Sequence, residues 1–174
     1  RPGGSTLSCA AMPAPTPPRL IHFHKPYGVL SQFTPEGRWR GLKDFIDHGG
    51  KLLVAHGSAD PVFSPIDTIA WYERLRAARG EQLGDSVRLF LIPGMNHSRG
   101  GPAADQVDLL GALMRWVEQG QAPASVVAAA RGPASNAPNP ELPPGWSPTR
   151  TRLLCPHPQV ARYQSGDAER ADSF

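Results

Sequence analysis

Two short apolar runs near the middle of the chain constrain its fold more than any other feature. The first occupies residues 51–55 and has glycines on both sides, and the second occupies residues 86–92 and stops at Pro93 and Gly94. Unbroken apolar runs of this length are typical of strands that are buried on both faces of a parallel sheet. We therefore predict two buried strands.

Helical patterns lie before, between and after these runs. Residues 42–46 have apolar side chains at helical spacing, and residues 64–80 begin with the serine and proline that suit a helix start and end in glycine. Apolar residues recur at helical spacing over residues 105–120. Residues 126–130 fit a short edge strand.

The order of these elements predicts an α/β fold. Right-handed crossovers place consecutive parallel strands side by side and put the helices on the faces of the sheet. The 20 Pro and 18 Gly lie mostly before Lys51 and after Gly120. We expect a flexible or irregular lead over 1–41, a sheet-bearing part over 42–131, and an extended Pro-rich tail over 132–174 that packs on it.

Composition narrows the class of protein. The chain has 174 residues, enough for one modest domain, and its net charge of +3 comes with scattered arginines, so the basic face of a nucleic-acid binder is missing. No apolar run reaches the roughly 18 residues of a membrane helix. The sequence starts without Met and without a signal peptide, so we expect it to begin inside a longer parent. Cys9 and Cys155 are too few for a disulfide framework.

Asp60 and His97 are the candidate catalytic residues because each closely follows one of the predicted strands. Functional groups of a parallel sheet gather beyond the carboxyl ends of its strands, so this carboxylate and this imidazole are placed to share a hydrogen bond. Singly, Asp60 suits a turn and His97 a solvated loop. As a pair they suit acyl transfer, in which the acid orients the histidine and the histidine removes and returns a serine proton.

The nucleophile of such a triad is missing from the sequence. In α/β hydrolases the triad runs nucleophile, acid, base along the chain, and Asp60 before His97 fits the last two. No Gly-x-Ser-x-Gly elbow occurs in the 174 residues, and Ser5 and Ser8 have no preceding strand. We therefore predict a fragment that carries the acid and the base and is inactive alone.

Four segments, in the right order, resemble the tannase and feruloyl esterase family of serine esterases. Residues 49–61 (GGKLLVAHGSADP) look like the family's acid segment, and residues 93–102 (PGMNHSRGGP) look like its histidine segment. Residues 112–123 are similar to its last helix, and residues 152–163 to its C-terminal segment. The resemblance spans roughly residues 45–174, and four ordered matches are more specific than either loop alone.

The resemblance implies the C-terminal portion of an α/β-hydrolase sheet, incomplete in this chain, and a carboxylic ester hydrolase acting on aromatic-acid esters such as those of gallate or ferulate. It also implies a secreted or periplasmic protein, and a lid with a structural calcium upstream of Asp60, so no cofactor is expected within this chain. The expected partner is a small aromatic ester, neither nucleic acid nor membrane, and the oligomeric state is open. The alternatives are an inactive remnant or interaction fragment and, further off, a serine peptidase of the same fold.

Three positions depart from the family pattern. The family usually has a cysteine directly after the histidine, bonded to one beside the nucleophile, and this chain has Ser98 there. Ser58 stands where the family often has an aromatic residue in the acid loop. Cys155 would normally pair with a cysteine near the chain end, and the printed sequence stops at Phe174 without one, so we predict an unpaired Cys155.

Other residues weigh less as functional candidates. His22 and His24 could share one side of a strand and bind a metal, but no further ligand cluster accompanies them. His56, at the end of the first strand, is predicted to be structural, although it lies close enough to tune the acid loop. Three aromatic residues of the helices are expected to pack rather than to bind substrate: Trp71, Tyr72 and Trp116.

Overall fold

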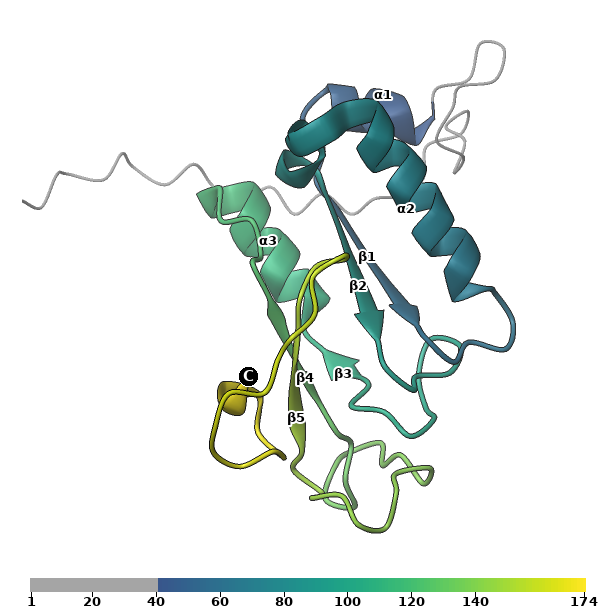
Figure 1. Ribbon diagram of the computed structural model, residues 1–174, viewed down its shortest axis with the longest axis vertical. Coiled ribbons are helices and arrows are strands. Elements are labelled where there is room, and N and C mark those ends of the chain that lie inside the picture. The colour runs from purple at the N-terminus through teal and green to yellow at the C-terminus, as the bar shows by residue number, and fades with distance from the viewer. Residues whose placement is uncertain (1–40) are drawn as a thin grey trace, which may run out of the picture.

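The computed structural model describes residues 41–174 (Figure 1). Its helices and strands are, in chain order, α1 (Leu42–Asp47), β1 (Leu52–Gly57), α2 (Pro65–Arg79), the 3-10 helix η1 (Gly80–Asp85), β2 (Val87–Ile92), β3 (Gln106–Val107), α3 (Leu109–Gln119), β4 (Val126–Ala129), β5 (Thr151–Leu154) and the 3-10 helix η2 (Ala171–Ser173). The predictions for the lead, for Cys9 and for the histidines His22 and His24 lie outside the described residues.

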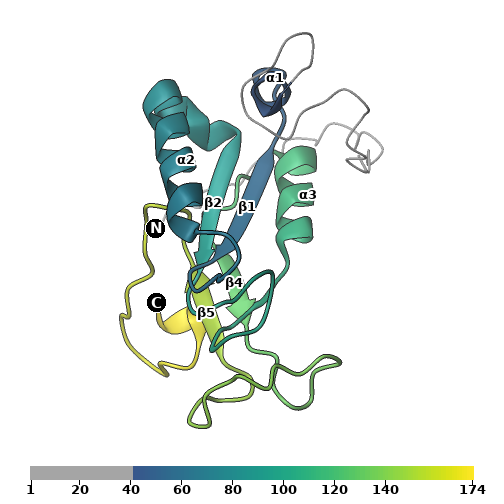
Figure 2. The ribbon, with the colours of Figure 1, turned by 90° about the vertical axis from the view of Figure 1, so that its right-hand side faces the viewer.

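The two predicted buried strands are present and form one parallel pair. Leu52 of β1 lies opposite Val87 of β2, and Gly57 lies opposite Ile92, so the two strands begin and end together. Helix α2 lies on one side of this pair and helix α3 on the other (Figure 2). The carboxyl ends of both strands therefore open on the same edge, where the loops after them meet.

Helix α2 begins where the sequence predicts it. Ser64 has extended backbone angles and Pro65 takes the first helical position, where its missing N–H costs nothing. The Ser64 hydroxyl makes no capping hydrogen bond. The feature that favours a helix start here is therefore Pro65 rather than the serine side chain. The helix ends at Gly80, whose φ of 61° is a conformation that favours glycine.

The C-terminal half departs from the prediction in three places. The helix predicted from Asp105 begins only at Leu109, because the Asp108 carboxylate accepts a 2.8 Å hydrogen bond from the Gly111 N–H and caps the helix. The residues before that cap form β3. Strand β4, predicted at an edge, is instead the middle strand of the antiparallel sheet β3-β4-β5. Strand β5 lies in the predicted extended tail and was not foreseen.

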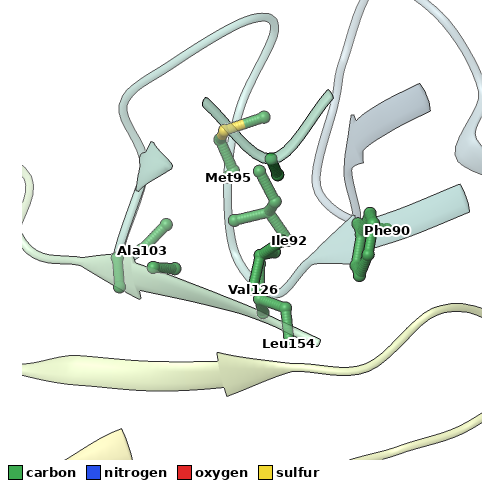
Figure 3. Packing of buried hydrophobic residues seen from close by; sticks show 9 residues of the cluster. Phe90, Ile92, Met95, Ala103, Val126 and Leu154 are labelled. Atoms are coloured by element: carbon green, nitrogen blue, oxygen red, sulfur yellow. The ribbon is translucent and has the colours of Figure 1, made fainter. Parts of the chain in front are cut away.

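Strand β2 lies between two hydrophobic clusters and contributes to both. On the α3 side, Phe90 and Ile92 pack with Met95 from the following loop and with Leu154 of β5 (Figure 3). On the α2 side, Val87 and Leu89 pack with the remaining members of the other cluster: Ile46, Tyr72, Leu75 and Leu83. Because β2 is covered on both faces, the loop that follows it starts from a fixed position.

Strand β1 is less well covered than β2. Every residue from Leu52 to His56 is only half-buried, whereas most residues of β2 are buried. Within the described part of the chain β1 has no strand on its other edge. The three helix aromatics pack as predicted, since Tyr72 and Trp116 are buried and Trp71 lies against the cluster beside α2.

Candidate active site

The loops that follow β1 and β2 are joined by main-chain and side-chain hydrogen bonds. The Ser58 N–H donates to the Ile92 carbonyl at 3.0 Å, the Ala59 N–H donates to the Met95 carbonyl at 3.1 Å, and the Gly94 N–H donates to Ser58 Oγ at 3.0 Å. A side chain at Gly57 would fall 2.2 Å from the Met95 carbonyl oxygen. A glycine is therefore required for the two loops to approach this closely.

This approach brings Asp60 and His97 together. Nδ1 of His97 lies 2.9 Å from Oδ2 of Asp60. The Asp60 side chain is 5% exposed, whereas that of His97 is 43% exposed. A carboxylate can only accept, so Nδ1 carries the proton and Nε2 is left as the basic nitrogen. Within the described residues Nε2 has no hydrogen-bond partner, and the Phe63 ring lies against the imidazole with a centroid distance of 5.2 Å.

The Asp60 carboxylate is fixed and kept ionised by its surroundings. Oδ1 accepts hydrogen bonds from the N–H groups of Val62 at 2.8 Å and Phe63 at 3.0 Å. Desolvation is the largest single influence and acts to raise the pKa of Asp60. The hydrogen bonds from Phe63, His97 and Val62 together outweigh it and lower that pKa to about 2. The carboxylate is therefore charged at neutral pH.

His56 is a second histidine in contact with the same carboxylate. Its Nε2 lies 3.3 Å from Oδ2 of Asp60 and 3.1 Å from the Phe63 carbonyl, and its Nδ1 lies 2.8 Å from Thr68 Oγ1. Nε2 can thus donate toward the Phe63 carbonyl and the Asp60 carboxylate, while Nδ1 and the Thr68 hydroxyl share a hydrogen bond. His56 thus links the acid loop to α2, and its structural rather than catalytic role stays a prediction.

The loop that carries His97 has an unusual backbone. Ser98, with φ of 65°, is the one non-glycine residue in the described part of the chain that has a positive φ, and Gly100 and Gly101 have φ of 80° and 77°. The Asn96 N–H donates to the Gly100 carbonyl at 3.1 Å, which closes a tight turn around His97. A side chain in the left-handed region costs energy, so Ser98 marks a strained turn next to the imidazole.

The remaining candidates are not part of this site. Cys155 is half-buried and forms no disulfide within residues 41–174. No group of three or more His, Cys, Asp or Glu side chains in that range is arranged to hold a metal ion. No helix of the described chain is long and apolar enough to cross a membrane.

Comparison with known proteins identifies relatives of this chain. A family model described as tannase and feruloyl esterase matches residues 39–174. Mono(2-hydroxyethyl) terephthalate hydrolase of Piscinibacter sakaiensis is 41% identical over 165 residues, which cover 86% of this chain and 24% of that protein. A probable feruloyl esterase of Arthroderma benhamiae is 33% identical over 174 residues, which cover 98% of this chain and 29% of that protein. The chain thus spans 24% and 29% of the length of these two relatives.

Solved structures show the same fold. An esterase from Aspergillus oryzae superposes with a TM-score of 0.61 at 24% identity, covering 76% of this chain and 28% of that one. A tannin acyl hydrolase from Aspergillus niger superposes with a TM-score of 0.51 at 23% identity, covering 67% of this chain and 21% of that one. These likenesses confirm the predicted fold class, a partial α/β-hydrolase sheet.

Proposed function

Because the chain belongs to the tannase and feruloyl esterase family, we propose that it is the part of a carboxylic ester hydrolase that carries the acid and the base of a catalytic triad. The observation that carries this proposal is the 2.9 Å contact between His97 Nδ1 and Asp60 Oδ2, with Nε2 left basic. In this reading Asp60 is the acid, His97 is the base, and the serine comes from sequence outside these residues.

The proposed mechanism assigns each group one task. His97 Nε2 takes the proton of the serine hydroxyl as that oxygen attacks the ester carbonyl, and then returns a proton to the departing alcohol. Asp60 holds the ring in the required tautomer and stabilises the imidazolium that forms. Water then attacks the acyl-enzyme by the same route and releases the acid. None of these steps calls for a cofactor bound by this chain.

Esters of aromatic acids are the proposed substrates. Phe63 is 62% exposed and lies against the His97 ring, and its neighbours Val62 and Ile66 are 61% and 72% exposed. These side chains offer an apolar surface beside the base, onto which an aromatic ring could stack. Relatives named for ferulate and terephthalate esters support the same class. We further propose a secreted or periplasmic protein, as the family resemblance implies.

A chimaeric enzyme tests this function directly. Residues 39–174 of this chain would replace the matching part of the Piscinibacter hydrolase, which supplies the upstream sequence. We expect the chimaera to hydrolyse methyl ferulate or methyl gallate, and His97→Ala to reduce kcat by roughly three to four orders of magnitude. The 174-residue chain assayed alone should show no turnover above its own His97→Ala variant.

Four results would contradict the proposal. A folded chimaera without turnover would favour an inactive remnant, and retained activity in His97→Ala would remove the base from the mechanism. Turnover of peptides in place of esters would favour a peptidase of the same fold. Hydrolysis by the 174-residue chain alone, lost in His97→Ala, would mean that a nucleophile lies within it.

A further inference from the structure

The histidine loop, residues 93–102, is held by side chains from the C-terminal tail. The main chain of Gly101 is bonded through both of its polar groups: its N–H donates to Glu141 Oε2 at 2.7 Å, and its carbonyl accepts from Asn139 Nδ2 at 2.8 Å. The other oxygen of Glu141 accepts from Asn96 Nδ2 at 3.3 Å. Asn96 directly precedes His97 and Gly101 follows it by four positions. The Glu141 carboxylate is therefore hydrogen-bonded to the loop on both sides of His97.

The tail that supplies this carboxylate is itself anchored beside the loop. Arg131 donates to both oxygens of Asp105, from Nε at 2.9 Å and from Nη2 at 2.6 Å, and the Asp105 side chain is fully buried. The same carboxylate accepts from the Gly100 N–H at 2.6 Å. The Arg131 carbonyl then accepts from the N–H of Asn139, which is buried. Bidentate contacts of this kind fix orientation as well as distance.

The loop needs such support because little else fixes His97. The imidazole is 43% exposed, and in the described part of the chain it has a hydrogen bond to Asp60 and a ring contact with Phe63. Ser98, directly after it, has φ of 65°. A strained residue of this kind keeps its conformation only when the surrounding structure holds it.

We propose that Glu141 is a positioning residue that holds His97 against Asp60 by bonding the loop on both sides of it. A role for Glu141 in catalysis rests on the function proposed above. Its role in the structure does not: loss of the Glu141 carboxylate should loosen the loop, so that the His97 ring no longer stays with Nδ1 directed at Asp60.

Nuclear magnetic resonance of the full 174-residue chain, labelled with ¹⁵N, tests this without turnover. Neutral imidazoles in water prefer the proton on Nε2, whereas the Asp60 contact demands it on Nδ1. In the unaltered chain, at alkaline pH, the His97 ¹⁵N shifts should report the Nδ1–H form, with His97→Ala used to assign the signals.

Glu141→Ala should shift the Gly101 amide and move His97 toward the Nε2–H form, and Glu141→Gln, which keeps one acceptor, should move it less. The matched controls Glu118→Ala and Glu118→Gln alter an exposed glutamate of α3 and should change neither signal.

The same variants in the chimaera give a second readout. Glu141→Ala should lower kcat roughly tenfold and leave KM unchanged, because substrate contacts are intact while the base is misplaced. The proposal would be overturned if the His97 ¹⁵N shifts stayed unchanged in both Glu141 variants, whether or not the Gly101 amide moves. If Glu141→Ala fails to fold, the His97 shifts of Glu141→Gln alone test the proposal. An unaltered chain without the Nδ1–H signature would overturn the proposed function as well, so the two failures are distinguishable.

Discussion

The two loops that meet in the candidate site are held in place by different means. The acid loop is held by its neighbours in sequence: Asp60 binds the N–H groups of Val62 and Phe63, and His56 reaches Thr68 at the start of α2. These contacts lie within a stretch of a dozen or so residues, and the loop is bonded in addition to the histidine loop through Ser58 and Ala59.

The histidine loop depends on distant residues instead. Glu141 lies 45 positions after Asn96, to which it bonds, and Arg131 lies 26 positions after Asp105. Both loops follow parallel strands and have hydrogen bonds of their own, but in the described part of the chain only the histidine loop is also bonded to side chains of the tail. We therefore expect the acid loop to depend on β1, α2 and the neighbouring histidine loop, whereas the histidine loop also requires the tail to be folded.

Asp60→Asn is the substitution with the largest expected effect on activity. An asparagine keeps an oxygen for the N–H groups of Val62 and Phe63, so the acid loop should keep its shape while the negative charge is lost. In the chimaera we expect kcat to fall by about four orders of magnitude, because the imidazolium loses its partner and the ring loses its tautomer. The measurement is kcat on methyl ferulate.

The matched control for that variant is Asp67→Asn, an exposed aspartate in the first turn of α2. It should leave kcat within a small factor of the unaltered chimaera. If Asp60→Asn fell no further than this control, the local supports of the acid loop would have no catalytic purpose.

Arg131→Ala should have the largest effect on the stability of the histidine side. It leaves Asp105, whose side chain is fully buried, without its cation. Breaking a buried ion pair on one side costs about 3–5 kcal/mol in the free energy of unfolding, which urea titration of the 174-residue chain would measure. Hydrogen exchange should quicken at Gly100 and Gly101 and stay unchanged at Val62.

The control for this prediction is Arg170→Ala, which breaks an ion pair with Asp172. The side chains of Arg170 and Asp172 are 64% and 65% exposed. That pair is exposed to solvent and should contribute little to the free energy of unfolding. Equal losses in the two variants would show that the tail holds the histidine loop no more firmly than a surface contact does.

The same contrast explains what the sequence could predict. Both strands, the proline start of α2 and the glycine end of α3 follow from short patterns, because a few neighbouring residues decide them. Asp60 and His97 are predicted as a pair for the same reason, since each lies just beyond a predicted strand, and the structure places their side chains 2.9 Å apart. Their roles in catalysis stay a proposal.

The parts that were missed depend on partners far along the chain. Strand β3 is two residues long and exists because it pairs with β4, so a helical pattern that includes Val107 predicted a helix too early. Strand β5 pairs with β4 across a long connection without any repeating pattern. Glu141 looked like one charged residue of a Pro-rich tail, and only the folded chain brings it to Gly101.

Acid should weaken the acid loop through Asp60. Its pKa is about 2 in the folded chain against an ordinary value of 3.8, because hydrogen bonds from Phe63, His97 and Val62 outweigh desolvation. As pH falls below about 4 the unfolded chain takes up a proton that the folded carboxylate does not, so the contribution of Asp60 is complete above that pH and is lost as pH falls toward 2. Urea unfolding at about pH 5 and about pH 2.5 should show the unaltered chain and Asp60→Asn converging in acid. A gap that stayed constant would contradict the lowered pKa.

Ser98→Gly has the smallest expected effect and tests whether the strained turn itself helps to place His97. Ser98 has φ of 65°, which glycine adopts without strain, so the substitution should raise the free energy of unfolding by about 1 kcal/mol or less. Ser125→Gly, at an exposed residue without a positive φ, should instead be neutral or destabilising in the same urea titration. A stabilised chain in which His97 keeps its Nδ1–H form would mean that Glu141 and Asn139 hold the loop and that the strain at Ser98 is only tolerated. A stabilised chain in which that form is lost would assign part of the positioning to the strained turn itself.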